Sequence, residues 1–187
     1  DAADALVDVA LPRPTAEGRD LLVEVRAVSV NPVDTKVRRN AAPGPGAWKV
    51  LGWDAAGVVV EAGADCSLFK PGDEVFYAGS LTRPGTNAQF HLVDERIVGR
   101  RPRSLDWAEA AAMPLTAITA WEALFERLDV RGREVPGAAS AILVIGGAGG
   151  VGSMAVQLAR RLTDLVVIAT ASRPETREWA KGLGAHH

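Results

Sequence analysis

Residues 141–152 read AILVIGGAGGVG, and this stretch decides the fold of the C-terminal part of the chain. The apolar run Ala141–Ile145 predicts a strand that is covered on both faces of a parallel sheet. Apolar residues then recur at helical spacing from Val151 to Leu162, and Leu165–Ala169 predicts a second buried strand. A strand, a glycine turn, a helix and a strand in this order predict a βαβ unit.

The glycines of this stretch form the pattern G-x-G-x-x-G. Early glycines let the backbone turn tightly and approach a pyrophosphate at the helix N-terminus, and the last one lets the helix pack closely on the strand. We therefore expect a dinucleotide cofactor at the loop of Gly147, Gly149 and Gly152. The alternative is a glycine-rich connector that binds no ligand.

The end of the second strand predicts which nicotinamide cofactor binds. A site for NAD places an acidic residue there, about 20 residues past the glycine loop. Here Ser172 and Arg173 occupy these positions, and the first acid is Glu175. Because a guanidinium can hold a 2′-phosphate through two hydrogen bonds, we predict NADPH rather than NADH. The alternative is that Arg173 is a solvated residue at the start of a helix.

Short strands separated by Gly and Pro turn signals fill the preceding part of the chain. They are expected at 21–28, 56–61, 74–77 and 88–93. This spacing predicts a small closed or partly closed β-barrel, and the fold class is therefore α/β with a β-barrel. A helix capped by Ser104 or Asp106 is expected at 107–112, and a second helix from Pro114 to about 128. A polar link follows at 129–138.

Composition excludes several classes of protein. The chain has 187 residues with 21 Lys and Arg against 23 Asp and Glu, so a nucleic acid or an anionic membrane has no electrostatic support as a partner. The longest apolar runs, such as 165–171, are far shorter than the about 20 residues of a membrane span. The single cysteine, Cys66, and the absence of a secretory h-region predict a cytoplasmic protein.

Five segments of the chain occur in the order seen in medium-chain dehydrogenases/reductases: 29–34, 51–59, 69–75, 114–120 and the glycine loop. The chain resembles the quinone oxidoreductase branch of that superfamily, in the group called zinc-type alcohol dehydrogenase-like. The resemblance implies a GroES-like barrel domain at 1–122 and the first half of a Rossmann NADP-binding domain at 123–187. It also implies a homodimer, and a natural protein that continues for well over about a hundred residues.

The residues at the metal positions argue against zinc. In zinc alcohol dehydrogenases the position of Asn31 holds a cysteine ligand, that of Trp53 a histidine ligand, and a third cysteine lies near Leu115. These three residues cannot build that site, and Cys66 alone cannot build a four-cysteine site. Asp54 by itself is a weak candidate for a stray metal. We therefore expect no zinc, and a packing role for Cys66.

The absence of a Lewis acid favours substrates that accept hydride easily. An alcohol dehydrogenase needs its metal to stabilise an alkoxide, whereas a quinone or an α,β-unsaturated carbonyl spreads the added charge over a conjugated system. We expect NADPH-dependent reduction of a quinone or of an activated C=C or carbonyl substrate, with a small molecule as the partner. The alternative is a non-catalytic NADPH-binding or interaction protein derived from this family.

The resemblance also assigns roles to individual residues. Asn31 is expected to face the substrate beside the nicotinamide, with Pro32 and Asp34 on the cofactor side. Thr119 is expected to approach the nicotinamide or its ribose, and the pyrophosphate is expected to be held by Ala148, Gly149, Gly150 and Val151. Trp53 is expected to line the substrate pocket, although a tryptophan belongs more often to a core.

The proton donor is the open point of this chemistry. Tyr77 is the only tyrosine, and its phenol could donate a proton, but a place in the barrel wall is an equal alternative. Family members often carry a tyrosine soon after the Asn-Pro-x-Asp turn, and residues 36–52 contain none. His91 stands alone in its strand, which favours a structural role over metal ligation.

Overall fold

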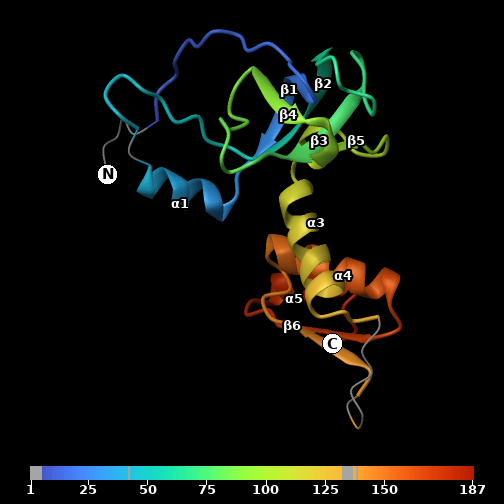
Figure 1. Ribbon diagram of the computed structural model, residues 1–187. Helices are drawn as coiled ribbons and strands as arrows, with labels where there is room; N and C mark the ends of the chain where they lie inside the picture. The colour runs from blue at the N-terminus through green and yellow to red at the C-terminus, as the bar shows by residue number, and fades with distance from the viewer. Residues whose placement is uncertain (1–5, 42, 132–136, 138) are drawn as a thin grey trace. The chain divides into compact units, whose positions relative to one another are not determined.

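The computed structural model describes residues 6–41, 43–131, 137 and 139–187. The chain forms two compact units, Asp1–Ala112 and Met113–His187 (Figure 1). They divide before the predicted boundary at 122/123, because helix α3 (Pro114–Trp121) packs against helix α4 (Gly150–Leu162) of the second unit. The assignment of functional domains to 1–122 and 123–187 stays a prediction.

The first unit is built on an antiparallel five-stranded sheet with the order β4-β1-β2-β3-β5. Its strands are β1 (Asp20–Ser29), β2 (Asp54–Ala62), β3 (Glu74–Ala78), β4 (Phe90–Asp94) and β5 (Val98–Arg100). The first four confirm the predicted strands. The fifth was not predicted, because a strand this short carries too few residues to show an alternating pattern.

Of the two predicted forms, a closed and a partly closed barrel, the residues that the structure describes do not form the closed one. Strands β4 and β5 stand at opposite ends of the sheet order, and β5 is paired with β3. Only the short 3₁₀ helix η1 (Glu95–Ile97) separates the end of β4 from the start of β5. The four residue steps from Asp94 to Val98 span about 14 Å at most. The sheet therefore curls until its two edge strands approach each other where β4 ends and β5 begins. The edges approach without a ladder of hydrogen bonds to close the barrel.

Alternating apolar residues of the first four strands form the core of this unit. The buried set is Leu21, Val23, Ala55, Val59, Val75, Tyr77 and Val93. Helix α2 (Trp107–Ala111) packs on β1 and β2. It begins after Asp106, whose carboxylate accepts the Glu109 N–H at 2.8 Å in a capping box, so Asp106 rather than Ser104 is the cap.

Helix α1 (Pro32–Asn40) replaces the turn that was expected after Asn31. Pro32 occupies its first position, where the missing N–H costs nothing, and Asp34 lies in its first turn. The Asp34 carboxylate accepts the Asn31 backbone N–H at 2.7 Å. These are helix-start signals, which were overlooked because the Asn-Pro pair was interpreted as the end of the preceding strand.

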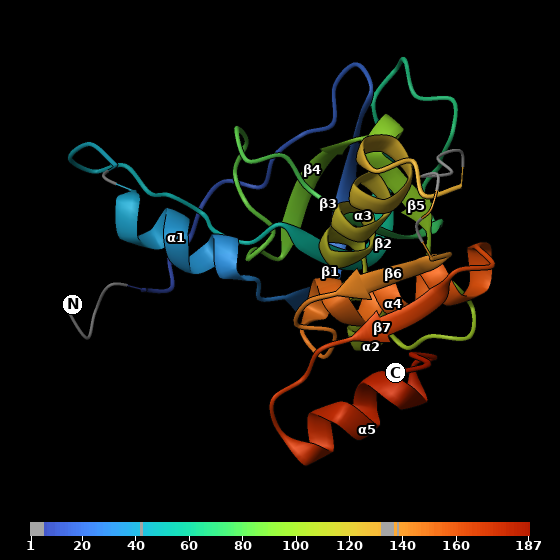
Figure 2. The same cartoon turned by 90° about the horizontal axis from the view of Figure 1, so that it is seen from below.

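The second unit contains the predicted βαβ arrangement. Strands β6 (Ala141–Val144) and β7 (Val166–Ala169) are parallel and lie side by side in Figure 2. Helix α4 connects them, and α5 (Pro174–Gly182) follows β7. Their buried side chains include Ala155, Val156, Ala159, Val167 and Ala180. This is only part of a Rossmann half, because the usual form of that fold has about six strands.

The helix predicted from Pro114 to about Leu128 continues beyond α3 as a π-helical segment, Glu122–Arg127. Most of the predicted link at 129–138 lies outside the described residues. No helix among the described residues is long and apolar enough to span a membrane.

Candidate functional site

The glycine loop joins β6 to α4, and its backbone is hydrogen-bonded to Thr170, the residue that follows β7. Gly146 N–H donates to Thr170 Oγ1 at 2.9 Å, and Gly147 N–H donates to the Thr170 carbonyl at 2.9 Å. A Cβ on Gly147 would lie 2.7 Å from the Ala169 Cβ, and one on Gly152 would lie 2.3 Å from the Gly146 carbonyl oxygen. Side chains are therefore excluded at both positions, as the pattern predicts.

The N-terminus of α4 offers backbone donors to a ligand. Its N-cap is Gly149, which has no side-chain oxygen to accept hydrogen bonds from the first turn. The N–H groups of Gly150, Val151 and Gly152 have no acceptor within the helix, and the helix dipole favours negative charge at this end. Gly149, Gly150 and Val151 are also exposed. The loop thus fits the pyrophosphate of a dinucleotide.

Helix α3 contacts this loop through Thr116 rather than through Thr119 (Figure 1 shows α3 and α4 side by side). A Cβ on Gly150 would lie 3.0 Å from Thr116 Cγ2. Thr119 is exposed, and its hydroxyl donates to the Leu115 carbonyl at 2.7 Å. Sequence reasoning missed Thr116, and the signal was its position one helical turn before Thr119, on the same face.

The segment between β7 and α5 carries the residues predicted to select NADPH. Ser172 and Arg173 are both exposed. Arg173 Nε lies 2.7 Å from Glu175 Oε1, but the two side chains are 69% and 68% exposed, so this ion pair contributes little. A phosphate can replace Glu175 as the partner of this guanidinium.

Arg177 was missed by sequence reasoning. Its Nε donates to the Ala171 carbonyl at 3.1 Å and its Nη2 to the Ser172 carbonyl at 3.2 Å. Arg177 thereby braces the segment that presents Ser172 and Arg173. The available signal was the spacing of four residues from Arg173, which places both arginines on one face of a helix start.

A buried polar cluster surrounds Asn31 in the first unit. Asn31 and Asp34 are each 7% exposed and Asp54 is 0% exposed. Asn31 Nδ2 donates to Asp54 Oδ2 at 2.8 Å. Trp53, 1% exposed, precedes Asp54 at the start of β2, and Pro32 is exposed at the start of α1. The structure therefore brings the predicted residues Asn31 and Asp34 together.

Two buried atoms of these residues have no hydrogen-bond partner among the described residues. They are Asp34 Oδ1, an acceptor, and Trp53 Nε1, a donor. An unsatisfied buried polar group costs about 1–3 kcal/mol, so these two atoms lower the stability of this cluster.

Tight turns on either side of Trp53 fix the start of β2. Gly52 has a φ of +95°, and a Cβ there would lie 2.6 Å from Thr86 Oγ1. Thr86 N–H donates to the Gly52 carbonyl at 2.9 Å, and its hydroxyl donates to the Asp54 carbonyl at 3.2 Å. Gly79 N–H donates to the Trp53 carbonyl at 2.7 Å. Only glycine fits at position 52, and the backbone of Asp54 is held rigidly.

Tyr77 is buried in the sheet and engaged with His91. The tyrosine is 2% exposed, and its hydroxyl lies 3.0 Å from His91 Nδ1. His91 Nε2 lies 3.1 Å from the Pro84 carbonyl, which can only accept, so Nε2 carries the proton and Tyr77 donates to Nδ1. Burial raises the pKa of Tyr77 and lowers the pKa of His91 to about 4. The arrangement favours the wall role for Tyr77 and a structural role for His91.

The residues at the zinc positions do not fit a zinc ion. The amide nitrogen of Asn31 and the indole N–H of Trp53 have no lone pair for a metal, the Asn31 amide oxygen is not one of the Cys, His, Asp or Glu ligands that zinc takes, and the Leu115 side chain has no ligand atom. Within the described ranges, no group of three or more His, Cys, Asp or Glu side chains could hold a metal ion. Cys66 packs against the core, and burial raises the pKa of its thiol.

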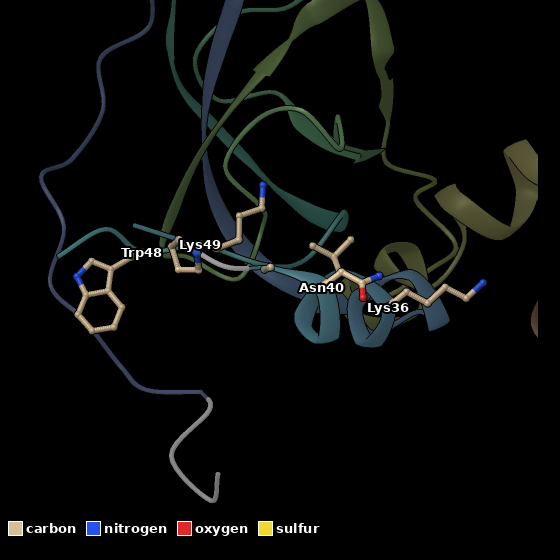
Figure 3. Close-up of a pocket in the computed structure, with 7 residues that line it drawn as sticks. Lys36, Asn40, Trp48 and Lys49 are labelled. Carbon is tan, nitrogen blue, oxygen red and sulfur yellow. The ribbon is translucent and has the colours of Figure 1, made fainter. Parts of the chain in front are cut away.

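A pocket of about 400 Å³ lies beside α1, lined by Lys36, Val37, Asn40, Pro43, Trp48 and Lys49 among others. Figure 3 shows the Lys36 ammonium and the Trp48 indole extending to opposite sides. These two groups therefore do not converge on one ligand. None of the site residues predicted from the sequence lines this pocket.

The family model of the alcohol dehydrogenase GroES-like domain matches residues 17–115. The chain belongs to this family. A zinc-type alcohol dehydrogenase-like protein of Staphylococcus aureus (strain COL) is 48% identical over 176 residues, which cover 92% of this chain and 51% of that protein. The 2-methylene-furan-3-one reductase of Solanum lycopersicum is 37% identical over 183 residues, covering 92% and 45%. The chain spans about half the length of the curated relatives it matches.

Solved structures agree with this family assignment. A crystal structure from Rhizobium etli CFN 42, provisionally named a zinc-dependent alcohol dehydrogenase, is 70% identical with a TM-score of 0.95, over 99% of this chain and 54% of that one. The Escherichia coli quinone oxidoreductase complexed with NADPH is 27% identical with a TM-score of 0.76, over 95% and 52%. The resemblance to medium-chain dehydrogenases/reductases is thus confirmed.

Proposed function

We propose that the complete protein is an NADPH-dependent oxidoreductase that reduces a quinone or an activated C=C or carbonyl substrate without zinc. The observation that carries the proposal is the glycine loop. Gly147 and Gly152 leave no room for side chains, and the exposed N-terminus of α4 has N–H groups without an acceptor in the helix, which supports pyrophosphate binding there. The E. coli quinone oxidoreductase was solved with NADPH, which supports the same cofactor class.

The chain's own residues would bind and orient the cofactor, whose nicotinamide supplies the hydride. The loop from Gly147 to Gly152 would hold the pyrophosphate. Ser172 and Arg173 would hold the 2′-phosphate on a segment braced by Arg177. The proposed roles of Thr119 beside the nicotinamide ribose and of Pro32 and Asp34 on the cofactor side rest on the family resemblance.

The donor set around Asn31 supports the zinc-free part of the proposal, although several relatives carry zinc in their names. Asn31 gives a side-chain N–H to Asp54 and has no lone pair on nitrogen for a metal. Without a Lewis acid, the favoured acceptors are those whose anion is conjugated. Because Tyr77 holds its proton inside the sheet, we assign protonation of that anion to solvent.

Turnover separates this proposal from the alternative of a non-catalytic NADPH-binding protein. The complete protein is mixed with NADPH and 9,10-phenanthrenequinone, and absorbance at the reduced nicotinamide band is followed. Oxidation of NADPH supports the reductase, and tight NADPH binding without turnover supports the alternative. A comparison of quinones with enals then ranks the substrate classes, and metal analysis that finds one zinc per chain would overturn the zinc-free assignment.

The homodimer and the cytoplasmic location stay predictions from the sequence. Gel filtration with light scattering on the complete protein tests the first of them.

A further inference from the structure

The side-chain amide of Asn31 has its hydrogen-bond donors directed into the protein. One Nδ2–H is given to Asp54 Oδ2 at 2.8 Å, and the same nitrogen lies 3.5 Å from the Ser29 carbonyl. The first is a charge-assisted hydrogen bond of good length between buried groups, and the second is long and weak. Asp54 therefore decides which way the amide nitrogen faces.

We propose that Asp54 is a positioning residue that fixes the Asn31 amide with its nitrogen turned inward. Two carboxylates then bracket the asparagine. Asp34 Oδ2 accepts its backbone N–H at 2.7 Å, and Asp54 Oδ2 accepts its side-chain N–H at 2.8 Å. The backbone and the side chain of Asn31 are thus held from two different elements, α1 and β2.

Asp54 is suited to this task because its own backbone cannot shift. The Thr86 hydroxyl holds its carbonyl, and the turn before it requires glycine at position 52. The Asp54 side chain is 0% exposed, and a buried carboxylate needs hydrogen-bond donors to offset its lost hydration. The Asn31 amide is one such donor, so the pair stabilises both the carboxylate and the orientation.

This orientation has a consequence for substrate choice, which rests on the proposed function. Hydride addition to an aldehyde leaves a localised oxyanion that needs donors from the protein, and an inward amide nitrogen cannot supply them. Hydride addition to a quinone leaves an anion spread over the ring, which needs less help. Asp54 thus disfavours simple carbonyl substrates and leaves quinones as the favoured class.

The hydrogen bond itself is tested by NMR, without reference to activity. In the ¹⁵N-labelled complete protein, the Asn31 side-chain NH₂ signal is assigned through its loss in Asn31→Leu. We expect slow hydrogen exchange for one of its protons in the wild type and in Asp54→Asn, which keeps an acceptor oxygen. Fast exchange is expected in Asp54→Ala. Fast exchange in the wild type would overturn the proposal.

Glu95→Gln is the matched control. Glu95 is a second carboxylate at 0% exposure, and it binds the Ser67 and Leu68 N–H groups and Arg19, far along the chain from Asn31. This variant should lower the melting temperature and leave the Asn31 signal unchanged. An equal loss of Asn31 protection in Glu95→Gln would show that Asp54 acts only through general stability.

A double-mutant cycle in the complete protein tests the link to catalysis. Asp54→Ala frees the Asn31 amide nitrogen to turn toward an oxyanion, so it should raise the ratio of kcat for a simple aldehyde to kcat for phenanthrenequinone about tenfold, the scale of one hydrogen bond. Asn31→Ala should leave this ratio low, and the double variant should match Asn31→Ala. An equal rise of the ratio in Asp54→Ala and in the double variant would overturn the positioning role. If the wild type shows no turnover, the proposed function fails, while the NMR result still decides the hydrogen bond.

Discussion

The glycine loop of the second unit and the Asn31 cluster of the first unit present opposite kinds of site. The loop offers backbone N–H groups on an exposed helix N-terminus, and side chains are excluded at Gly147 and Gly152. The Asn31 cluster is buried, and its recognition groups are side chains that bond one another. A backbone site depends on the shape of a continuous stretch of chain, whereas a side-chain site depends on contacts between distant segments.

The largest effect should come from filling the glycine loop. Gly152→Val places a side chain where a Cβ would already lie 2.3 Å from backbone oxygen, so the turn must rearrange. We expect loss of NADPH binding by at least about a hundredfold in calorimetric titration, together with about 3 kcal/mol of stability. Gly182→Ala, on α5 with open space around its Cβ, is the control: it should leave NADPH binding unchanged and should not lower stability, because a helix favours alanine over glycine. If Gly152→Val and Gly182→Ala bind NADPH equally well, the cofactor is not held by the backbone of the glycine loop.

The next effect concerns the buried side chains of the first unit. Burial lowers the pKa of His91 to about 4 from its ordinary 6.5, so the neutral form is favoured in the folded state. The contribution of neutral His91 to the free energy of unfolding is fully present above pH 6.5. It falls by about 3 kcal/mol in total as the pH drops toward 4. Urea denaturation between pH 7 and pH 4 measures it. His91→Gln should show a shallower decline, and an identical decline would remove His91 as the cause.

A smaller effect is expected at the end of β7, where the second unit does use side chains. Arg173→Glu should weaken NADPH by about thirtyfold, a loss of roughly 2 kcal/mol from a charged hydrogen bond and added repulsion. NADH, which lacks the 2′-phosphate, should bind within about threefold of wild type. Arg161→Glu, near the far end of α4, is the control. Equal weakening of both cofactors would show that Arg173 does not read the phosphate.

The smallest effect is expected from Tyr77→Phe. The variant removes one hydrogen bond to His91 and should cost about 1 kcal/mol of stability. Since the phenol proton is held inside the sheet, kcat for phenanthrenequinone should change by less than about twofold. A fall of a hundredfold with unchanged stability would restore Tyr77 as the proton donor.

Local patterns predicted much of this molecule. The strands at 21–28, 56–61 and 74–77 were found from alternation and turn residues, and the βαβ unit from the apolar runs around the glycine loop. Helix α1 was missed because Asn-Pro ends a strand as readily as it starts a helix. Strand β5 was missed because three residues show no period.

Side-chain partnerships were harder to predict. The Tyr77 pair with His91 joins residues 14 apart on non-adjacent strands, and the Asn31 pair with Asp54 joins residues 23 apart. Neither spacing carries a periodic signal, because loop lengths set it. Thr116 and Arg177 lay one helical turn from predicted residues, and helical spacing alone would have found them.

The sequence by itself determined the glycine loop, the parallel strand pair and the lack of zinc ligands at Asn31, Trp53 and Leu115, because each depends on residue type within one short segment. Only the tertiary structure decided that the sheet stays open between β4 and β5, that the Tyr77 hydroxyl donates a hydrogen bond to His91, and that Asp54 turns the Asn31 amide inward. Those outcomes depend on which distant segments meet in the fold, and burial then makes each polar group bond the partner it meets.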